Sequence, residues 1–166
     1  MRRFALVALC AAALAAPAAA KPVVVYGYPL ATRCPAEGVA KSIDEFGMFA
    51  CNCTSYVAWA LHANGQRVDW FVPGSMDAWN WPNVARHAHI PVGGTPRVGA
   101  VAVWPKLVPK FGHVAYVTGL EPDGHFDVAE YNLHAHTRAG LAFDTRVDVD
   151  PRGAIFIYVP SAPMAR

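Results

Sequence analysis

The first half of the chain carries apolar residues at helical spacing. The segment 53–63, CTSYVAWALHA, has this pattern, and an Asn-Gly pair directly after it favours a stop. Asn52 stands at the N-cap position, immediately before the predicted helix. A second helix is predicted over 76–89, capped by Ser75 and interrupted or kinked near Pro82.

The second half has the pattern of a β-sheet. After a glycine pair at 93–94, short segments rich in β-branched and aromatic residues are separated by Gly, Pro or Asp. Strands are predicted at 98–104, 113–120, 125–131, 143–149 and 154–159. Helices followed by a run of strands are typical of the α+β class, in which helices back an antiparallel sheet.

The N-terminus differs from both halves and has the three parts of a secretory signal peptide. Arg2 and Arg3 precede an uncharged apolar run from 4 to 16, and Ala18-Ala19-Ala20 provides an A-x-A cleavage site before Lys21. The run is too short to be a comfortable membrane span. We therefore expect an exported protein, periplasmic or secreted, that begins near Lys21 after cleavage; an uncleaved anchor is the alternative.

Removal of this segment makes the chain electrically neutral. The whole chain has 14 Lys and Arg against 12 Asp and Glu, and 12 of each remain without Arg2 and Arg3. A neutral protein has no electrostatic reason to bind nucleic acid or an anionic membrane. We therefore expect neither as a partner, and a polymer or a small molecule instead. The length of 166 residues fits one domain with a single core.

Three cysteines remain after residue 20, and their spacing leaves one thiol over. Cys51 and Cys53 are too close to bridge each other easily, so we expect a disulfide between Cys34 and Cys51. This bridge would contribute roughly 3 kcal/mol by restricting the unfolded chain. Cys53 would then be a free thiol in a compartment that favours disulfides. Such a thiol is either reactive or a buried, inert cysteine.

The predicted place of Cys53 favours a reactive thiol. At the first turn of a helix, unpaired N–H groups and the helix dipole favour a thiolate. A thiolate there is a good nucleophile if a base lies nearby and hydrogen-bond donors stabilise the oxyanion. The Asn52 side chain and the Cys53 backbone N–H are the candidate donors.

The base is expected from the two strands that flank a turn at 121–124. His113 opens the first strand, and Glu130 and Asn132 close the second. A four-residue loop would set His113 opposite Asn132 with Glu130 on the diagonal, whereas an odd loop would break this alignment. Three polar residues at one end of a hairpin suit a base and its orienting groups.

Four short motifs occur in order along the chain, and they are Cys53–Ala58, Val98–Trp104, Gly112–Val117 and Ala129–Asn132. Together they resemble the CHAP domain, the cysteine, histidine-dependent amidohydrolases/peptidases within the papain-like NlpC/P60 superfamily. The resemblance implies a papain-like α+β fold, with N-terminal helices packed on a five- to six-stranded antiparallel sheet. It also implies a CHAP-like catalytic domain at 45–160. We expect the signal peptide at 1–20 and an irregular lead-in at 21–44 before this domain, and a tail at 161–166 after it.

The same resemblance implies a role for single residues. The family's nucleophile falls on Cys53, its base on His113, its orienting acid on Glu130 and its polar accessory residue on Asn132. The residue linked to the oxyanion site falls on Asn52. The implied protein is a bacterial monomer without metal or cofactor. It would hydrolyse peptidoglycan or its peptide fragments as an N-acetylmuramoyl-L-alanine amidase or a peptide-bridge endopeptidase.

Three aromatic residues are candidates for the wall of a substrate groove. They are Trp79, Trp81 and Tyr131. The two tryptophans could equally be ordinary core residues.

Two other hypotheses about the function stay open. A zinc-dependent hydrolase could draw its ligands from five histidines and two cysteines, namely His62, His87, His89, His134, His136, Cys51 and Cys53, although no HExxH or paired CxxC spacing is present. The second alternative is a non-catalytic cell-wall binding module. Binding alone would not require a free exported thiol, which favours the enzyme.

Overall fold

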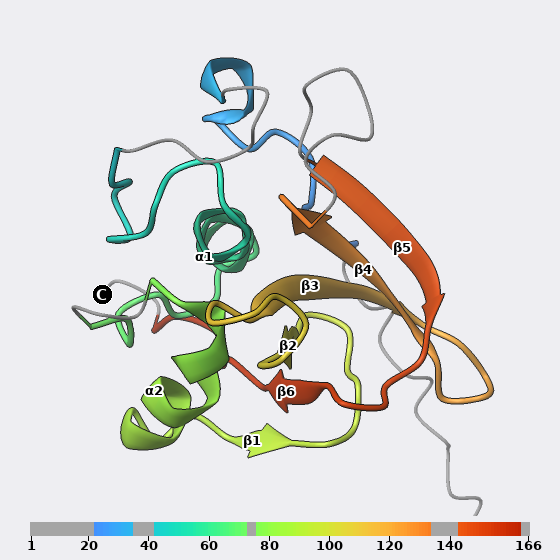
Figure 1. Cartoon of the computed structure of the whole chain (residues 1–166). Coiled ribbons are helices and arrows are strands. Elements are labelled where there is room, and N and C mark those ends of the chain that lie inside the picture. The colour runs from blue at the N-terminus through green and yellow to red at the C-terminus, as the bar shows by residue number, and fades with distance from the viewer. Residues whose placement is uncertain (1–21, 35–41, 73–75, 134–142, 164–166) are drawn as a thin grey trace, which may run out of the picture.

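The computed structural model describes residues 22–34, 42–72, 76–133 and 143–163. These residues form two α-helices, two 3-10 turns and a six-stranded sheet (Figure 1): η1 (Ala31–Arg33), α1 (Cys53–Ala63), η2 (Ala78–Asn80), α2 (Trp81–His87), β1 (Val92–Gly93), β2 (Val101–Trp104), β3 (His113–Leu120), β4 (Phe126–Tyr131), β5 (Phe143–Val149) and β6 (Ile155–Ile157). Within the described ranges no helix has the length and apolar character needed to cross a membrane. The predicted signal peptide at 1–20 lies outside them.

The helix α1 has the bounds that the sequence predicts, and it is almost wholly buried. Its side chains are apolar on nearly every face, so the sheet and the surrounding loops cover it on several sides. Asn64 ends the helix, and its backbone N–H donates to the carbonyl of Ala60 at 3.1 Å. This rigid helix fixes the position of Cys53, which is its first residue.

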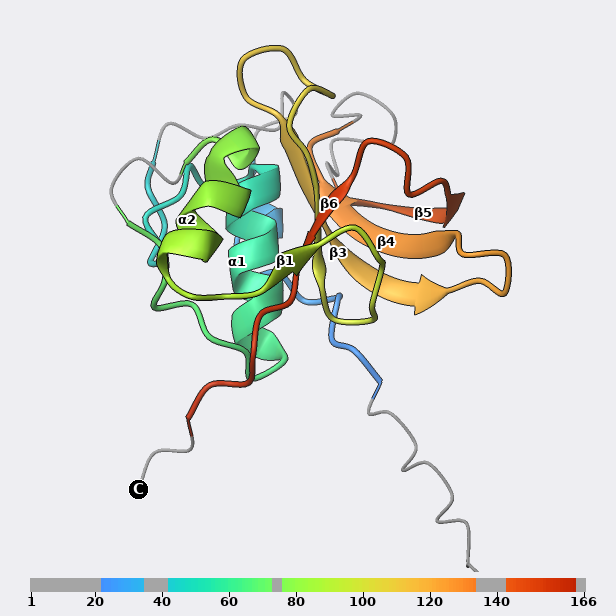
Figure 2. The ribbon, with the colours of Figure 1, turned by 90° about the horizontal axis from the view of Figure 1, so that it is seen from below.

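The sheet is antiparallel throughout and has the order β1-β6-β2-β3-β4-β5. Five of its strands overlap the predicted ones. The sixth, β1, pairs Val92 with Ile157 and is too short to show an alternating pattern. Both helices lie on one side of the sheet (Figure 2). The predicted α+β class is therefore confirmed.

The two faces of the central strands are both buried. Val114 and Tyr116 of β3 belong to the main core that surrounds α1. Ala115 and Val117 belong to a second core on the other face, which includes Phe126 and the ring of Trp104. His113 has the parity of this second face, but it opens the strand and therefore lies at the margin between the two cores.

The second helix is shorter than predicted. Instead of one helix over 76–89, a 3-10 turn (η2) leads into α2, and Pro82 lies in the first turn of α2 rather than at a kink. Proline is tolerated there because the first-turn N–H groups have no partner within the helix. Ser75, the predicted cap, lies outside the described residues.

The register of the β3–β4 hairpin agrees with the prediction, but the turn does not. Near the turn Leu120 pairs with Phe126, and a three-residue turn of odd length joins the strands. A bulge at Thr118 then shifts the register by one residue, so that Ala115 pairs with Glu130. The predicted four-residue turn is wrong, and the bulge compensates for it.

Candidate active site

Cys53 is held at the start of α1 by the residue before it. Asn52 is the N-cap with extended backbone, and its Oδ1 accepts the Cys53 backbone N–H at 2.8 Å. The Cys53 side chain is buried and its thiol is free. The structure thus places the expected nucleophile at a helix N-terminus, where its backbone cannot shift without breaking the cap.

The segment before Cys53 is tied down covalently and by hydrogen bonds. Cys51 forms the predicted disulfide with Cys34 and has a left-handed backbone, with φ of 63°. The Cys51 N–H donates to the Tyr28 hydroxyl at 3.1 Å, Tyr28 hydrogen-bonds Ser55, and the Ser55 hydroxyl donates to Asp44. This buried relay explains a small polar residue at position 55 of the helix.

His113 lies between Cys53 and Glu130. Its Nε2 is 3.0 Å from Glu130 Oε2, and its ring also hydrogen-bonds Cys53, for which Nδ1 remains. Burial alone would lower the pKa of His113, but the hydrogen bonds to Cys53 and Glu130 outweigh it and raise the pKa to about 9. The imidazolium form, which can pair with a thiolate, is therefore favoured.

Glu130 is fully buried and has two cationic partners. Besides His113, it accepts a bidentate pair from Arg146, with Nε to Oε1 at 2.7 Å and Nη2 to Oε2 at 2.9 Å. Burial would raise the pKa of Glu130, yet the hydrogen bonds from His113 and Arg146 lower it. The carboxylate stays ionised and aimed at the imidazole.

Sequence reasoning missed Arg146. It lies on β5, opposite Val128 of β4, so it shares a face with Glu130 two residues further along β4. The sequence did offer one signal: Arg146 is the single basic residue of the predicted strand FDTRVDV, and a buried carboxylate on a neighbouring strand needs a cation. That signal could not be used without the β4–β5 register.

Asn132 does not orient the imidazole directly. Its backbone is left-handed, with φ of 61°, and its Nδ2 donates to Asn52 Oδ1 at 3.2 Å. Asn52 Oδ1 therefore accepts from both Asn132 and Cys53, which turns the Asn52 NH₂ group toward other partners. Of the two candidate oxyanion donors, the Cys53 N–H is engaged by Asn52 Oδ1 in this structure, which leaves the Asn52 NH₂ group as the candidate.

A cavity of about 390 Å³ opens beside the thiol. Its polar wall contains the two asparagines and the reactive pair, Asn52, Asn132, Cys53 and His113. The remaining lining is mostly apolar and consists of Phe49, Met76, Asp77, Ala78, Val108, Phe111 and Gly112. Glu130 and Arg146 are not part of the lining, and Glu130 is connected to the cavity through its bond to His113.

Gly112 allows a close approach that shapes this cavity. Its φ is +68°, and a Cβ there would lie 2.7 Å from the backbone nitrogen of Trp79. The Trp79 N–H donates to the Phe111 carbonyl at 3.0 Å, which holds η2 against the chain just before His113. Only glycine fits this position without a shift of the cavity wall.

The three aromatic residues expected at the groove lie elsewhere. Trp81 is fully buried and packs on Trp70 and Phe71, and Tyr131 is buried against Tyr28. Their burial corrects the expectation of a groove wall, because α2 and β4 turn these rings into the main core. Trp79 is 44% exposed, and its backbone rather than its ring supports the cavity.

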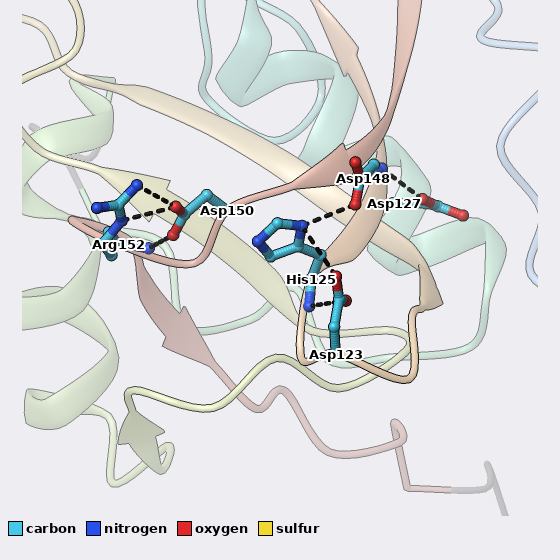
Figure 3. A network of polar contacts seen from close by, with 6 residues as sticks. All are labelled: Asp123, His125, Asp127, Asp148, Asp150 and Arg152. Carbon is cyan, nitrogen blue, oxygen red and sulfur yellow. Dashed lines mark hydrogen bonds and ion pairs between the residues drawn. The ribbon is translucent and has the colours of Figure 1, made fainter.

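Among the residues that the structure describes, the zinc ligands considered from the sequence do not come together. Cys51 is in the disulfide, the His62 ring packs on Phe46, and His134 and His136 lie outside the described residues. Among the described residues, one group has metal-ligand spacing, with its ligand atoms within 4.8 Å of one another: Asp123, His125 and Asp148. It lies at the turn end of the β3–β4 hairpin (Figure 3). There the His125 Nδ1 already pairs with Asp148 at 2.7 Å.

A cysteine that begins a helix and faces a histidine that opens a strand defines a papain-like arrangement, and the expected papain-like α+β fold is confirmed. Residues 43–132 match the family model of the CHAP domain, and the chain belongs to this family. A matching solved structure is an N-acetylmuramoyl-L-alanine amidase from Staphylococcus aureus, with a TM-score of 0.53 and 25% identity. The match covers 65% of this chain and 30% of the amidase chain. No curated protein matches the chain.

Proposed function

We propose that this protein is an exported cysteine hydrolase that cleaves amide bonds in bacterial peptidoglycan. One observation carries the proposal. The free thiol of Cys53, the imidazole of His113 and the carboxylate of Glu130 follow one another in a buried row, and the thiol borders a cavity. Membership of the CHAP family and the likeness to a muramoyl-alanine amidase support peptidoglycan as the substrate.

The first half of the reaction is attack by the thiolate. His113 holds the proton of Cys53, and Sγ bonds to the carbonyl carbon of the bound amide. We assign the stabilisation of the resulting oxyanion to the Asn52 NH₂ group. This assignment is supported by the two hydrogen bonds that Asn52 Oδ1 accepts, which leave the NH₂ group for other partners. His113 then gives its Nδ1 proton to the nitrogen of the leaving amine as the C–N bond breaks, which leaves a thioester on Cys53.

The second half releases the acid. A water molecule loses its proton to His113 and attacks the thioester carbon, and Cys53 departs as a thiolate. Glu130 keeps its hydrogen bond to Nε2 throughout, so that Nδ1 always faces the reacting atoms. The overall reaction consumes one water and converts an amide into a carboxylic acid and an amine.

The bond cut is either the muramoyl–alanine amide or a peptide bond of the bridge. Purified peptidoglycan incubated with the protein should release fragments whose new termini, identified by mass spectrometry, distinguish the two. Cys53→Ala should release none, whereas His125→Ala, a change at the opposite end of the same hairpin, should retain full activity. Full activity of Cys53→Ala would contradict the proposed mechanism.

Inhibitors separate this proposal from its alternatives. Iodoacetamide should abolish the hydrolysis and EDTA should leave it unchanged, while the reverse result would indicate a zinc-dependent hydrolase. Binding of peptidoglycan without any turnover by the wild type would indicate a wall-binding module. Export is tested by the N-terminus of the protein recovered from cells, which should lie near Lys21.

A further inference from the structure

Four side chains behind the cavity form a closed ring of contacts. His113 hydrogen-bonds Glu130, and Glu130 accepts two hydrogen bonds from Arg146. The Arg146 guanidinium lies over the Trp104 ring, with its carbon 4.9 Å from the ring centroid. The Trp104 ring in turn stacks on the imidazole of His113, with centroids 6.2 Å apart and planes at 29°. Each group is therefore held from two sides.

We propose that Arg146, seated on Trp104, is a positioning residue for the reaction: it keeps Glu130 ionised and directed at His113 Nε2. This inference rests on the proposed cysteine hydrolase function. It assigns to β5 a part in the reaction, although no residue of β5 lines the cavity.

The need for such a residue follows from the burial of Glu130. The carboxylate has 0% exposure, and an isolated buried carboxylate takes up a proton rather than remain charged. His113 alone offers it one N–H. The bidentate guanidinium supplies two more and fixes the plane of the carboxylate, which a lysine could not do.

Trp104 explains how Arg146 can hold this position. Trp104 pairs with His113 across β2 and β3, so its ring covers the imidazole from the strand next door. The same ring offers its π-face to the guanidinium, which restricts Arg146 to the side facing Glu130. Arg146 is 28% exposed and borders a second hollow on the outer face, whose lining shares no residue with the cavity beside the thiol.

The charged groups that face Glu130 are few. On β3 there is His113, with Cys53 of α1 beyond it. On β5 there are Arg146 and, directly opposite Glu130, Asp144, whose Oδ1 accepts the neighbouring Thr145 N–H. Trp104 of β2 carries no charge. Arg146 is therefore one of two cations beside Glu130, and its loss would raise the pH at which Glu130 becomes ionised.

The test is the pH profile of Arg146→Gln. Both kcat/KM for peptidoglycan hydrolysis and the rate of Cys53 alkylation by iodoacetamide should have acid-side midpoints about one pH unit higher than in the wild type. Turnover should fall by about 10- to 100-fold with KM nearly unchanged. Arg146→Lys keeps the charge but not the bidentate hydrogen bonds. Its pH midpoints should therefore lie close to those of the wild type, while its kcat should recover only in part.

Arg152→Gln is the matched control. Arg152 borders the same outer hollow and pairs with Asp150 at the surface, so its loss removes the same charge without touching Glu130. Its pH profile should equal that of the wild type. If Arg146→Gln melts at a lower temperature but keeps the wild-type midpoints in both assays, the role of Arg146 is structural and the inference fails. Full activity of Cys53→Ala would instead refute the underlying function, whatever Arg146→Gln does.

Discussion

A histidine–carboxylate pair lies at each end of the β3–β4 hairpin, and in the pair at the turn end the carboxylate of Asp148 comes from the neighbouring strand β5. The two pairs differ in burial and in the groups around them. At the open end, His113 bonds Glu130 with both side chains at 1% exposure or less. At the turn end, His125 bonds Asp148 at 2.7 Å and lies 3.6 Å from Asp123, with its side chain 32% exposed (Figure 3).

The surroundings of the two pairs are also different. The Asp148 N–H donates to Asp127 Oδ1, and Asp150 pairs with Arg152, so the turn end is a network among surface groups (Figure 3). At the open end, one nitrogen of His113 faces a thiol and the network is closed by buried partners.

The pKa is raised for both histidines, which shows that a raised pKa does not by itself identify a catalytic base. For His125 the main cause is the hydrogen bond to Asp148, helped by the charge of Asp123. For His113 burial opposes the shift, and the hydrogen bonds to Cys53 and Glu130 overcome it. The two histidines differ in their second partner: His113 interacts with the free thiol of Cys53 beside a cavity, whereas the partners of His125 are surface carboxylates.

The largest expected difference between the two ends is in catalysis. In the proposed mechanism His113 activates Cys53 and protonates the leaving amine, so His113→Ala should lower turnover by about 10²- to 10⁴-fold. His125→Ala should change turnover by less than about twofold, because the side chain touches no reacting atom. Release of peptidoglycan fragments measures both. Equal losses would mean that the hairpin acts through its fold and not through His113.

The carboxylates should show the same contrast at a smaller scale. Glu130→Gln keeps the shape of the side chain but removes the charge that supports the imidazolium, so we expect turnover to fall by about 10- to 100-fold. Asp148→Asn makes the same chemical change at the turn end and should leave turnover unaffected. Circular dichroism of both variants checks that each is folded. If Glu130→Gln were as active as Asp148→Asn, the carboxylate would not support catalysis.

The Cys34–Cys51 disulfide lies next to Cys53 and has no counterpart near the turn end of the hairpin. Its loss should affect stability more than catalysis. Replacement of Cys34 and Cys51 by serine should lower the free energy of unfolding by roughly 3 kcal/mol, because the unfolded chain regains the freedom of the loop. Urea unfolding measures this loss, and the folded variant should keep an alkylatable Cys53. Dithiothreitol should destabilise the wild type to a similar degree and have no effect on the double variant. A loss below about 0.5 kcal/mol would contradict the entropic account.

Much of the open end could be predicted from local signals. The cap at Asn52 and the apolar spacing after it located the helix start at Cys53. The turn-forming residues Pro122, Asp123 and Gly124 located the hairpin, and its register at the open end was predicted correctly. The reasoning behind that register was wrong, however, because a bulge at Thr118 cancels an odd turn. Bulges depend on sheet twist and packing, which no short segment specifies.

The parts that could not be predicted depend on contacts between distant segments. Arg146 reaches Glu130 through the β4–β5 register, and the connection between those strands is too long for parity to fix it. Likewise, the sequence could not tell whether Trp79, Trp81 and Tyr131 face a groove or a core, because an aromatic ring suits both. The packing of α2 and β4 decides that two of them are core residues.

The smallest expected effect is the pH dependence of stability at the turn end. The pKa of His125 is raised above its ordinary value of 6.5 in the folded protein, so its ion pair with Asp148 stabilises the fold fully below about pH 6.5. That contribution is lost as pH rises through the raised pKa. His113 has the same sign, but its contribution persists until about pH 9. Between about pH 6 and pH 8, the melting temperature of the wild type should therefore fall more than that of His125→Gln. High salt should shrink this difference, because the pair is exposed. If the melting temperature changed equally with pH in the two proteins, the network at the turn would contribute nothing to stability. The buried His113–Glu130 pair would then be the one of the two pairs whose charge can stabilise the fold.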